Sequence, residues 1–127
     1  MATAAYKAYQ TIQVQSSDPK TLLLMVMDAA CSFLRQAREA IEQKRWDVKH
    51  ERIVRVQEIV RQLSLALRDD VAPELAETLR KLYIHIDLVL TEANLEDDIE
   101  KLRHAEEIMS RLAEAWRQAA EGASGGG

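Results

Sequence analysis

Apolar residues recur along most of this chain at alternating steps of three and four positions, the spacing that places them on one face of an α-helix. Four separate stretches show this pattern. Their repeating positions are Leu23, Met27, Ala30, Leu34, Ala37 and Ile41; then Ile53, Val56, Val60, Leu63 and Leu67; then Leu75, Leu79, Leu82, Ile86, Val89 and Ala93; and last Leu102, Ala105, Met109, Leu112, Trp116 and Ala119. The pattern therefore predicts four helices of similar length.

Residues that favour helix ends lie at the limits of these stretches. Asp18 can accept hydrogen bonds from free backbone N–H groups at a helix start, and Pro19 suits the first helical position, where a missing N–H costs nothing. By the same reasoning we expect Asp47 to cap the second helix and Pro73 to open the third. Gly122 is expected to end the fourth helix, because glycine readily takes the left-handed conformation that follows a helix.

The connections between the four stretches are short, so neighbouring helices are expected to run antiparallel. The predicted fold class is all-α, an up-down-up-down four-helix bundle formed by residues 18–122. Residues 1–17 precede the bundle as an N-terminal extension or short extra helix. Residues 123–127 have the sequence Ala-Ser-Gly-Gly-Gly and are expected to form a flexible tail.

The overall composition favours a packed protein, since 47% of the residues are apolar and 30% are charged. The formal net charge is −4, and the basic residues are scattered among acidic ones, so we expect no nucleic-acid partner. Cys31 is the single cysteine, which excludes an intramolecular disulfide. The longest apolar stretch, residues 22–27, is too short to span a bilayer. A soluble, cytoplasmic protein without membrane insertion is expected.

Residues suited to catalysis or metal binding are present but not in a functional pattern. His50, His85 and His104 lie on three different expected helices, and none belongs to the Glu-x-x-His pairs on which di-metal bundle sites depend. Cys31 has no evident base and no serine lies in a nucleophile elbow. We therefore expect no enzyme activity, no metal and no cofactor. A histidine phosphotransfer module and a structural helical interaction module stay open as alternatives.

The repeating apolar positions of each stretch form a seam along one face of its helix. Apolar residues outside these four seams are numerous in the first and third stretches. They are Leu22, Val26, Ala29 and Phe33 in the first, and Tyr83, Ile84, Leu88 and Leu90 in the third. Such residues either widen the core or line a groove for a partner helix or an extended chain. Periodicity alone does not separate these two interpretations.

Several short motifs occur in a specific order along the chain. They are Ala8-Tyr9-Gln10, Gln13-Val14, Ser17-Asp18-Pro19, the stretch Leu22 to Met27, Asp28, Phe33-Leu34, the run Glu74 to Leu79 with Leu82-Tyr83, Glu92-Ala93-Asn94-Leu95 with Asp98, and Ala115-Trp116. In this order they resemble the flagellar secretion chaperones of the FliS type, over essentially the whole chain up to about Gly122.

The resemblance implies a chaperone that binds the disordered C-terminal segment of flagellin, prevents premature polymerisation, and delivers it to a component of the flagellar type III export gate. It also implies that Tyr9 lies in a region of client and export-gate contact. The segment from Tyr6 to Val14 is expected to act as a lid over the binding groove. The expected binding residues are Tyr6, Tyr9, Ile12, Val14, Leu22, Val26, Leu82, Tyr83, Ile86, Leu90 and Asn94.

Overall fold

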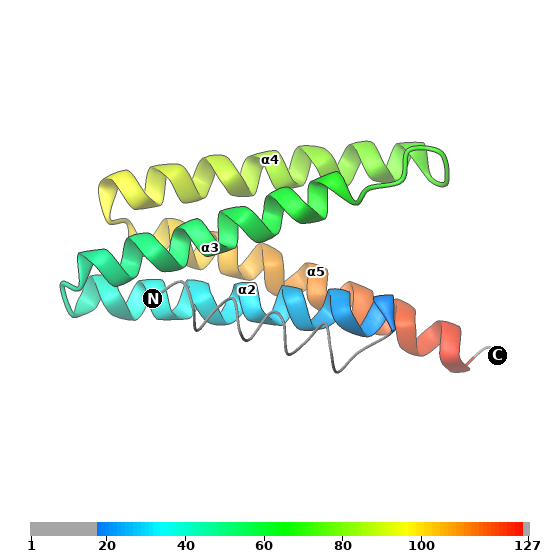
Figure 1. Cartoon of the computed structure of the whole chain (residues 1–127), viewed down its shortest axis with the longest axis horizontal. Helices are drawn as coiled ribbons and strands as arrows, with labels where there is room; N and C mark the ends of the chain where they lie inside the picture. Colours follow the sequence, from blue (N-terminus) through cyan, green and yellow to red (C-terminus); the bar gives the residue numbers. More distant parts are fainter. Residues whose placement is uncertain (1–17, 126–127) are drawn as a thin grey trace.

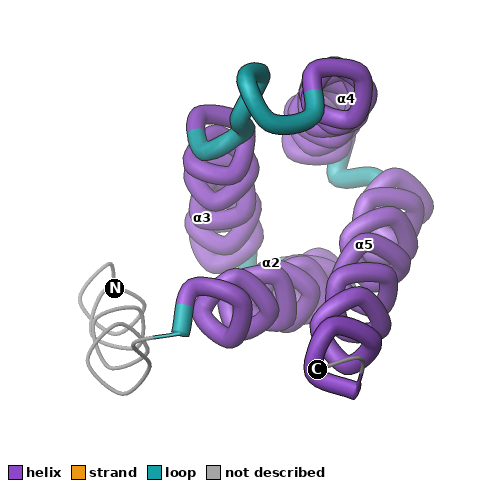
Figure 2. Tube along the Cα trace, turned by 90° about the vertical axis from the view of Figure 1, so that its right-hand side faces the viewer, coloured by secondary structure: helices purple, strands orange, loops and turns teal. Residues whose placement is uncertain are grey.

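The computed structural model describes residues 18–125 of the chain, with side chains described through residue 122, and this part forms four helices (Figure 1). They are α2 (Pro19–Glu42), α3 (Trp46–Leu65), α4 (Pro73–Glu96) and α5 (Ile99–Gly125). Each helix packs against the next one along the chain, and α5 packs back against α2. Seen from the end, the four helices surround a common centre (Figure 2). The predicted all-α, up-down-up-down bundle is confirmed.

The core contains side chains from all four helices. Its largest fully buried members are Met27, Leu34, Ile53, Val56, Ile86, Leu90, Leu102 and Met109. All but Leu90 occupy the seams predicted from the spacing of apolar residues. Burial of a side chain of this size contributes roughly 1.5–3 kcal/mol to folding, so the shared core is what holds the four helices together.

The start of α2 forms as predicted. The Asp18 side chain accepts a hydrogen bond from the Lys20 backbone N–H at 3.1 Å and another from the Thr21 hydroxyl at 2.8 Å. The Thr21 bond is the main reason that the pKa of Asp18 lies below its usual value, because both bonds favour the ionised carboxylate. Pro19 follows as the first residue of the helix.

Two predicted helix ends are wrong. Helix α3 begins at Trp46, so Asp47 lies inside its first turn and does not cap it. The reason is a tight turn: Lys44 takes a left-handed φ of 58°, and the Arg45 N–H donates to the Ala40 carbonyl at 2.8 Å, which closes α2 after Glu42 and lets α3 begin at Trp46. A negative charge in the first turn still complements the helix dipole.

The other wrong end is that of α5, which continues to Gly125 and does not stop at Gly122. No glycine in the described part of the chain has a positive φ, so Gly122 does not take the left-handed conformation that would have ended the helix. None of the described helices combines the length and the apolar character needed to cross a membrane.

Candidate functional site

A groove runs between α3 and α4. Its cavity volume is about 190 Å³, and its lining residues are Gln57, Val60, Arg61, Ser64, Tyr83, Ile84 and Asp87. Val60 and Tyr83 are buried and form an apolar floor, while Arg61 and Asp87 are exposed at the rim. An apolar floor with a polar rim is the usual arrangement of a protein-binding surface.

The outer face of α4 extends this groove with exposed apolar residues. Ile84, Leu88 and Leu95 are 63%, 58% and 81% exposed, respectively. Their spacing of four and seven residues places them along one side of the helix. Ile84 also lines the groove, so groove and stripe are continuous. We call Val60, Tyr83, Ile84, Leu88 and Leu95 together the α4 apolar surface.

A second apolar cavity lies where α2 begins and α5 nears its end. Its volume is about 270 Å³, and it is lined by Pro19, Lys20, Leu23, Trp116, Ala119 and Ala120. Leu23 and Trp116 also pack against the core from this side. Because Pro19 is the first residue of α2, the cavity lies close to the point where residues 1–17 join the bundle.

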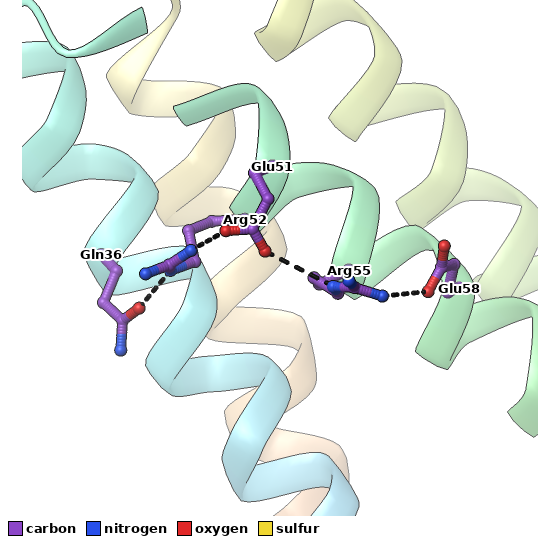
Figure 3. Close-up of polar contacts among 5 residues, drawn as sticks. All are labelled: Gln36, Glu51, Arg52, Arg55 and Glu58. Carbon is purple, nitrogen blue, oxygen red and sulfur yellow. Dashed lines mark hydrogen bonds and ion pairs between the residues drawn. The ribbon is translucent and has the colours of Figure 1, made fainter. Parts of the chain in front are cut away.

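A chain of polar side chains lies along one edge of the contact between α2 and α3 (Figure 3). The Arg52 Nε donates to the Gln36 side-chain oxygen at 2.5 Å, which joins the two helices. Glu51 pairs with Arg52 and, at 3.4 Å, with Arg55, whose guanidinium also reaches Glu58 at 3.1 Å. This polar chain contrasts with the apolar floor of the α3–α4 groove and offers little to an apolar partner.

A buried lysine holds the C-terminal end of α4. Lys49 of α3 is only 7% exposed, and its Nζ donates to the Asn94 carbonyl at 2.9 Å and pairs with Asp97. Asp97 closes α4 in a left-handed conformation with φ 54°. The Asn94 amide nitrogen also lies 2.9 Å from Nδ1 of His50. Positive charge at a helix C-terminus is favourable, so Lys49 fixes the α3–α4 pair that carries the groove.

Comparison with known proteins agrees with this architecture. The family model described as "Flagellar protein FliS" matches residues 1–123. The chain belongs to the FliS family. The flagellar secretion chaperone FliS of Bacillus subtilis (strain 168) is 30% identical over 114 residues, which cover 90% of this chain and 84% of that protein. The flagellar secretion chaperone FliS of Salmonella typhimurium is 32% identical over 123 residues, which cover 93% of this chain and 91% of that protein.

A solved structure shares the fold. The crystal structure of a flagellar chaperone from bacteria superposes with a TM-score of 0.77 at 17% sequence identity, covering 96% of this chain and 99% of that one. The family model and the two relatives confirm the resemblance seen in the sequence motifs, and the described residues of this FliS family member form four helices.

In this FliS family member, the apolar residues expected to bind on α4 divide between core and groove. Ile86 and Leu90 are fully buried, so they belong to the core and not to an accessible surface. Tyr83 forms part of the groove floor, and burial raises the pKa of its hydroxyl. Leu82 is half-buried against the core. Of these four residues, Tyr83 alone lines the groove.

The other expected binding residues lie elsewhere. Leu22 and Val26 are half-buried on α2, away from the residues that line the α3–α4 groove. Asn94 bonds to Lys49 and His50 and so helps to hold the end of α4. Tyr6, Tyr9, Ile12 and Val14 lie outside the described residues.

Sequence reasoning left Leu95 and the Leu23–Trp116 cavity out of the expected binding residues. The signal for part of the site was nevertheless present, because Ile84 and Leu88 lie off the predicted seam of α4.

Cys31 is half-buried, and its pKa is raised to about 11, mainly by burial and next by the nearby Asp28. Its thiol is therefore protonated at neutral pH. No group of three or more potential metal ligands occurs among the described residues.

Proposed function

We propose that the chain is a cytoplasmic export chaperone that binds the disordered C-terminal segment of flagellin. In this role it prevents premature polymerisation and delivers the subunit to the flagellar type III export gate. Membership of the FliS family supports the proposal, as does the name of the relatives, flagellar secretion chaperone. The observation that carries it is the α4 apolar surface, whose members Ile84, Leu88 and Leu95 are exposed and continue from the α3–α4 groove.

The α4 apolar surface suits a client that folds when it binds. An amphipathic helix presents apolar residues three, four and seven positions apart, and Ile84, Leu88 and Leu95 repeat at matching intervals. Full burial of three such side chains contributes roughly 1.5–3 kcal/mol each. Ordering a disordered client costs about 2–5 kcal/mol or more. The net affinity from this surface alone is therefore modest, which allows release at the export gate without a chemical step.

The proposal includes a role for residues 1–17 as an internal competitor of the client. Tyr6, Tyr9, Ile12 and Val14 supply the apolar side chains that a lid over the α3–α4 groove needs in order to compete with the client. Deletion of residues 1–15 should then tighten binding of the flagellin segment and reduce export. Unchanged affinity together with unchanged export would rule this role out.

Isothermal titration calorimetry with the C-terminal segment of flagellin from the same organism tests the client assignment. We expect one segment to bind per chain, and a scrambled segment of the same composition to give no heat. Absence of binding to the authentic segment would refute the proposed function.

The location of the client is tested with Leu88→Lys, which places a charge in the middle of the α4 apolar surface. Leu75→Lys is a matched control, because Leu75 is also an exposed leucine of α4, 53% exposed, but lies about 140° away around the helix. We expect Leu88→Lys to weaken binding at least about tenfold, equivalent to roughly 1.4 kcal/mol, and Leu75→Lys to bind normally. Equal effects of the two variants would contradict the assigned location.

A further inference from the structure

Two histidines from different helices meet on the surface of the bundle. His85 lies on α4 and His104 on α5, and their Nε2 atoms are 3.0 Å apart. The ring centroids are 5.3 Å apart, and the ring planes are nearly perpendicular, at 85°. Both side chains are exposed, so solvent and solutes can reach them without opening the core.

We propose that His85 and His104 form a bis-imidazole site for a late first-row divalent cation, Cu²⁺ or Ni²⁺. Neutral imidazole is a good ligand for these ions. Each ring can carry its proton on Nδ1 and leave the Nε2 lone pair for the metal. In the absence of metal the same contact is a hydrogen bond, in which one Nε2 carries the proton and the other accepts it.

The two Nε2 atoms face each other directly, at the 3.0 Å of a hydrogen bond, with the ring centroids 5.3 Å apart. Because both side chains are exposed, each ring can turn until its Nε2 lone pair points to a shared ion. Imidazole nitrogen is a suitable ligand for Cu²⁺ and Ni²⁺, and the affinity of such sites rises along the first row to Cu²⁺. Water completes the coordination of this exposed site.

The surrounding charges permit a cation at this position. Arg103 precedes His104 in the chain but pairs with Glu100 at 2.5 Å, and Lys101 pairs with Glu96 at 2.6 Å and Glu92 at 3.6 Å. The chain as a whole has a formal net charge of −4. A bound metal would link α4 to α5 next to Ile84 and so would stabilise the folded bundle.

Titration of the untagged full-length chain with NiCl₂ and CuCl₂, followed by calorimetry, tests the proposal. One metal ion should bind per chain, and either His85→Gln or His104→Gln should weaken binding at least about tenfold. His50→Gln is the matched control, because His50 is the third histidine and contacts Asn94 instead; its binding should equal that of the unmodified chain. The Cu²⁺ electron paramagnetic resonance spectrum should show coupling to two nitrogens.

Thermal unfolding gives a second readout. At a free metal concentration 100 times the dissociation constant, the Tm should rise by roughly 10 °C in the unmodified chain and in His50→Gln, and by much less in the two other variants. Retention of tight binding in either His85→Gln or His104→Gln would overturn the proposal, because a bridging site needs both rings. A failure of the unmodified chain to bind either ion at millimolar concentration would overturn it as well.

Discussion

Truncation of two isoleucines of α4, only two positions apart, should change the stability of the bundle by very different amounts. Ile86 is fully buried within the core cluster, whereas Ile84 is 63% exposed beside the α3–α4 groove. Ile86→Ala removes packed methyl groups and leaves a cavity, so we expect the free energy of unfolding to fall by about 2–5 kcal/mol. Ile84→Ala should change it by no more than about 0.5 kcal/mol. The larger loss is a substantial part of the roughly 5–15 kcal/mol that stabilises a typical domain.

Urea unfolding followed by circular dichroism at 222 nm measures both effects. Ile86→Ala should lower the unfolding midpoint with an unchanged slope, and Ile84→Ala should leave both unchanged. The same Ile84→Ala protein should bind the flagellin segment more weakly, because its defect lies in the docking surface. Equal losses of stability in the two variants would refute the division of α4 into a core side and a docking side.

Three further results are expected. Lys49→Met should lower the free energy of unfolding by about 2–4 kcal/mol, since it removes charge-assisted bonds at the end of α4. Lys101→Met should lower it by less than about a third as much in the same urea experiment, because surface ion pairs contribute little. Equal losses in the two variants would contradict this role of Lys49. Asp18→Ala should lower the free energy of unfolding at pH 7. This loss should shrink as the pH falls below about 3.8, because the Thr21 and backbone hydrogen bonds hold the pKa of Asp18 below that value. A loss of stability that does not depend on pH would contradict that cause. Iodoacetamide should alkylate Cys31 about 100-fold more slowly at pH 7.5 in the folded than in the urea-unfolded chain, because its pKa is about 11 against 9.0; equal rates, followed by mass spectrometry, would contradict its burial.

The helices and their seams could be predicted because an α-helix imposes its period on the apolar residues. Met27, Ile53 and Met109 were placed in the core from spacing alone, and all three are buried. The start of α2 could be predicted as well, because Asp18 and Pro19 act within one turn of their own positions. Asp47 shows the limit of such signals. The turn before it depends on the left-handed conformation of Lys44, which a lysine in a sequence does not predict.

The site could be predicted only in part, because it depends on how helices lie against one another. Leu88 and Leu90 both lie off the predicted seam of α4, yet one is exposed and the other fully buried. The helical period places Leu90 about 60° and Leu88 about 140° from the centre of that seam, but how far the core extends around α4 depends on where the neighbouring helices lie. The contact between His85 and His104 likewise depends on the register of α4 against α5. That register follows from the tight turn at Asp97, which spacing along the chain does not reveal.

The most direct test of the central claim is an NMR titration of the ¹⁵N-labelled chain with the C-terminal segment of flagellin. The largest changes in amide chemical shift should fall on the α4 apolar surface, at Ile84, Leu88 and Leu95 and at Val60 across the groove, while the initially disordered segment gains dispersed signals. Changes confined to other faces of the bundle, or no changes at saturating segment, would contradict the claim that this surface holds the client.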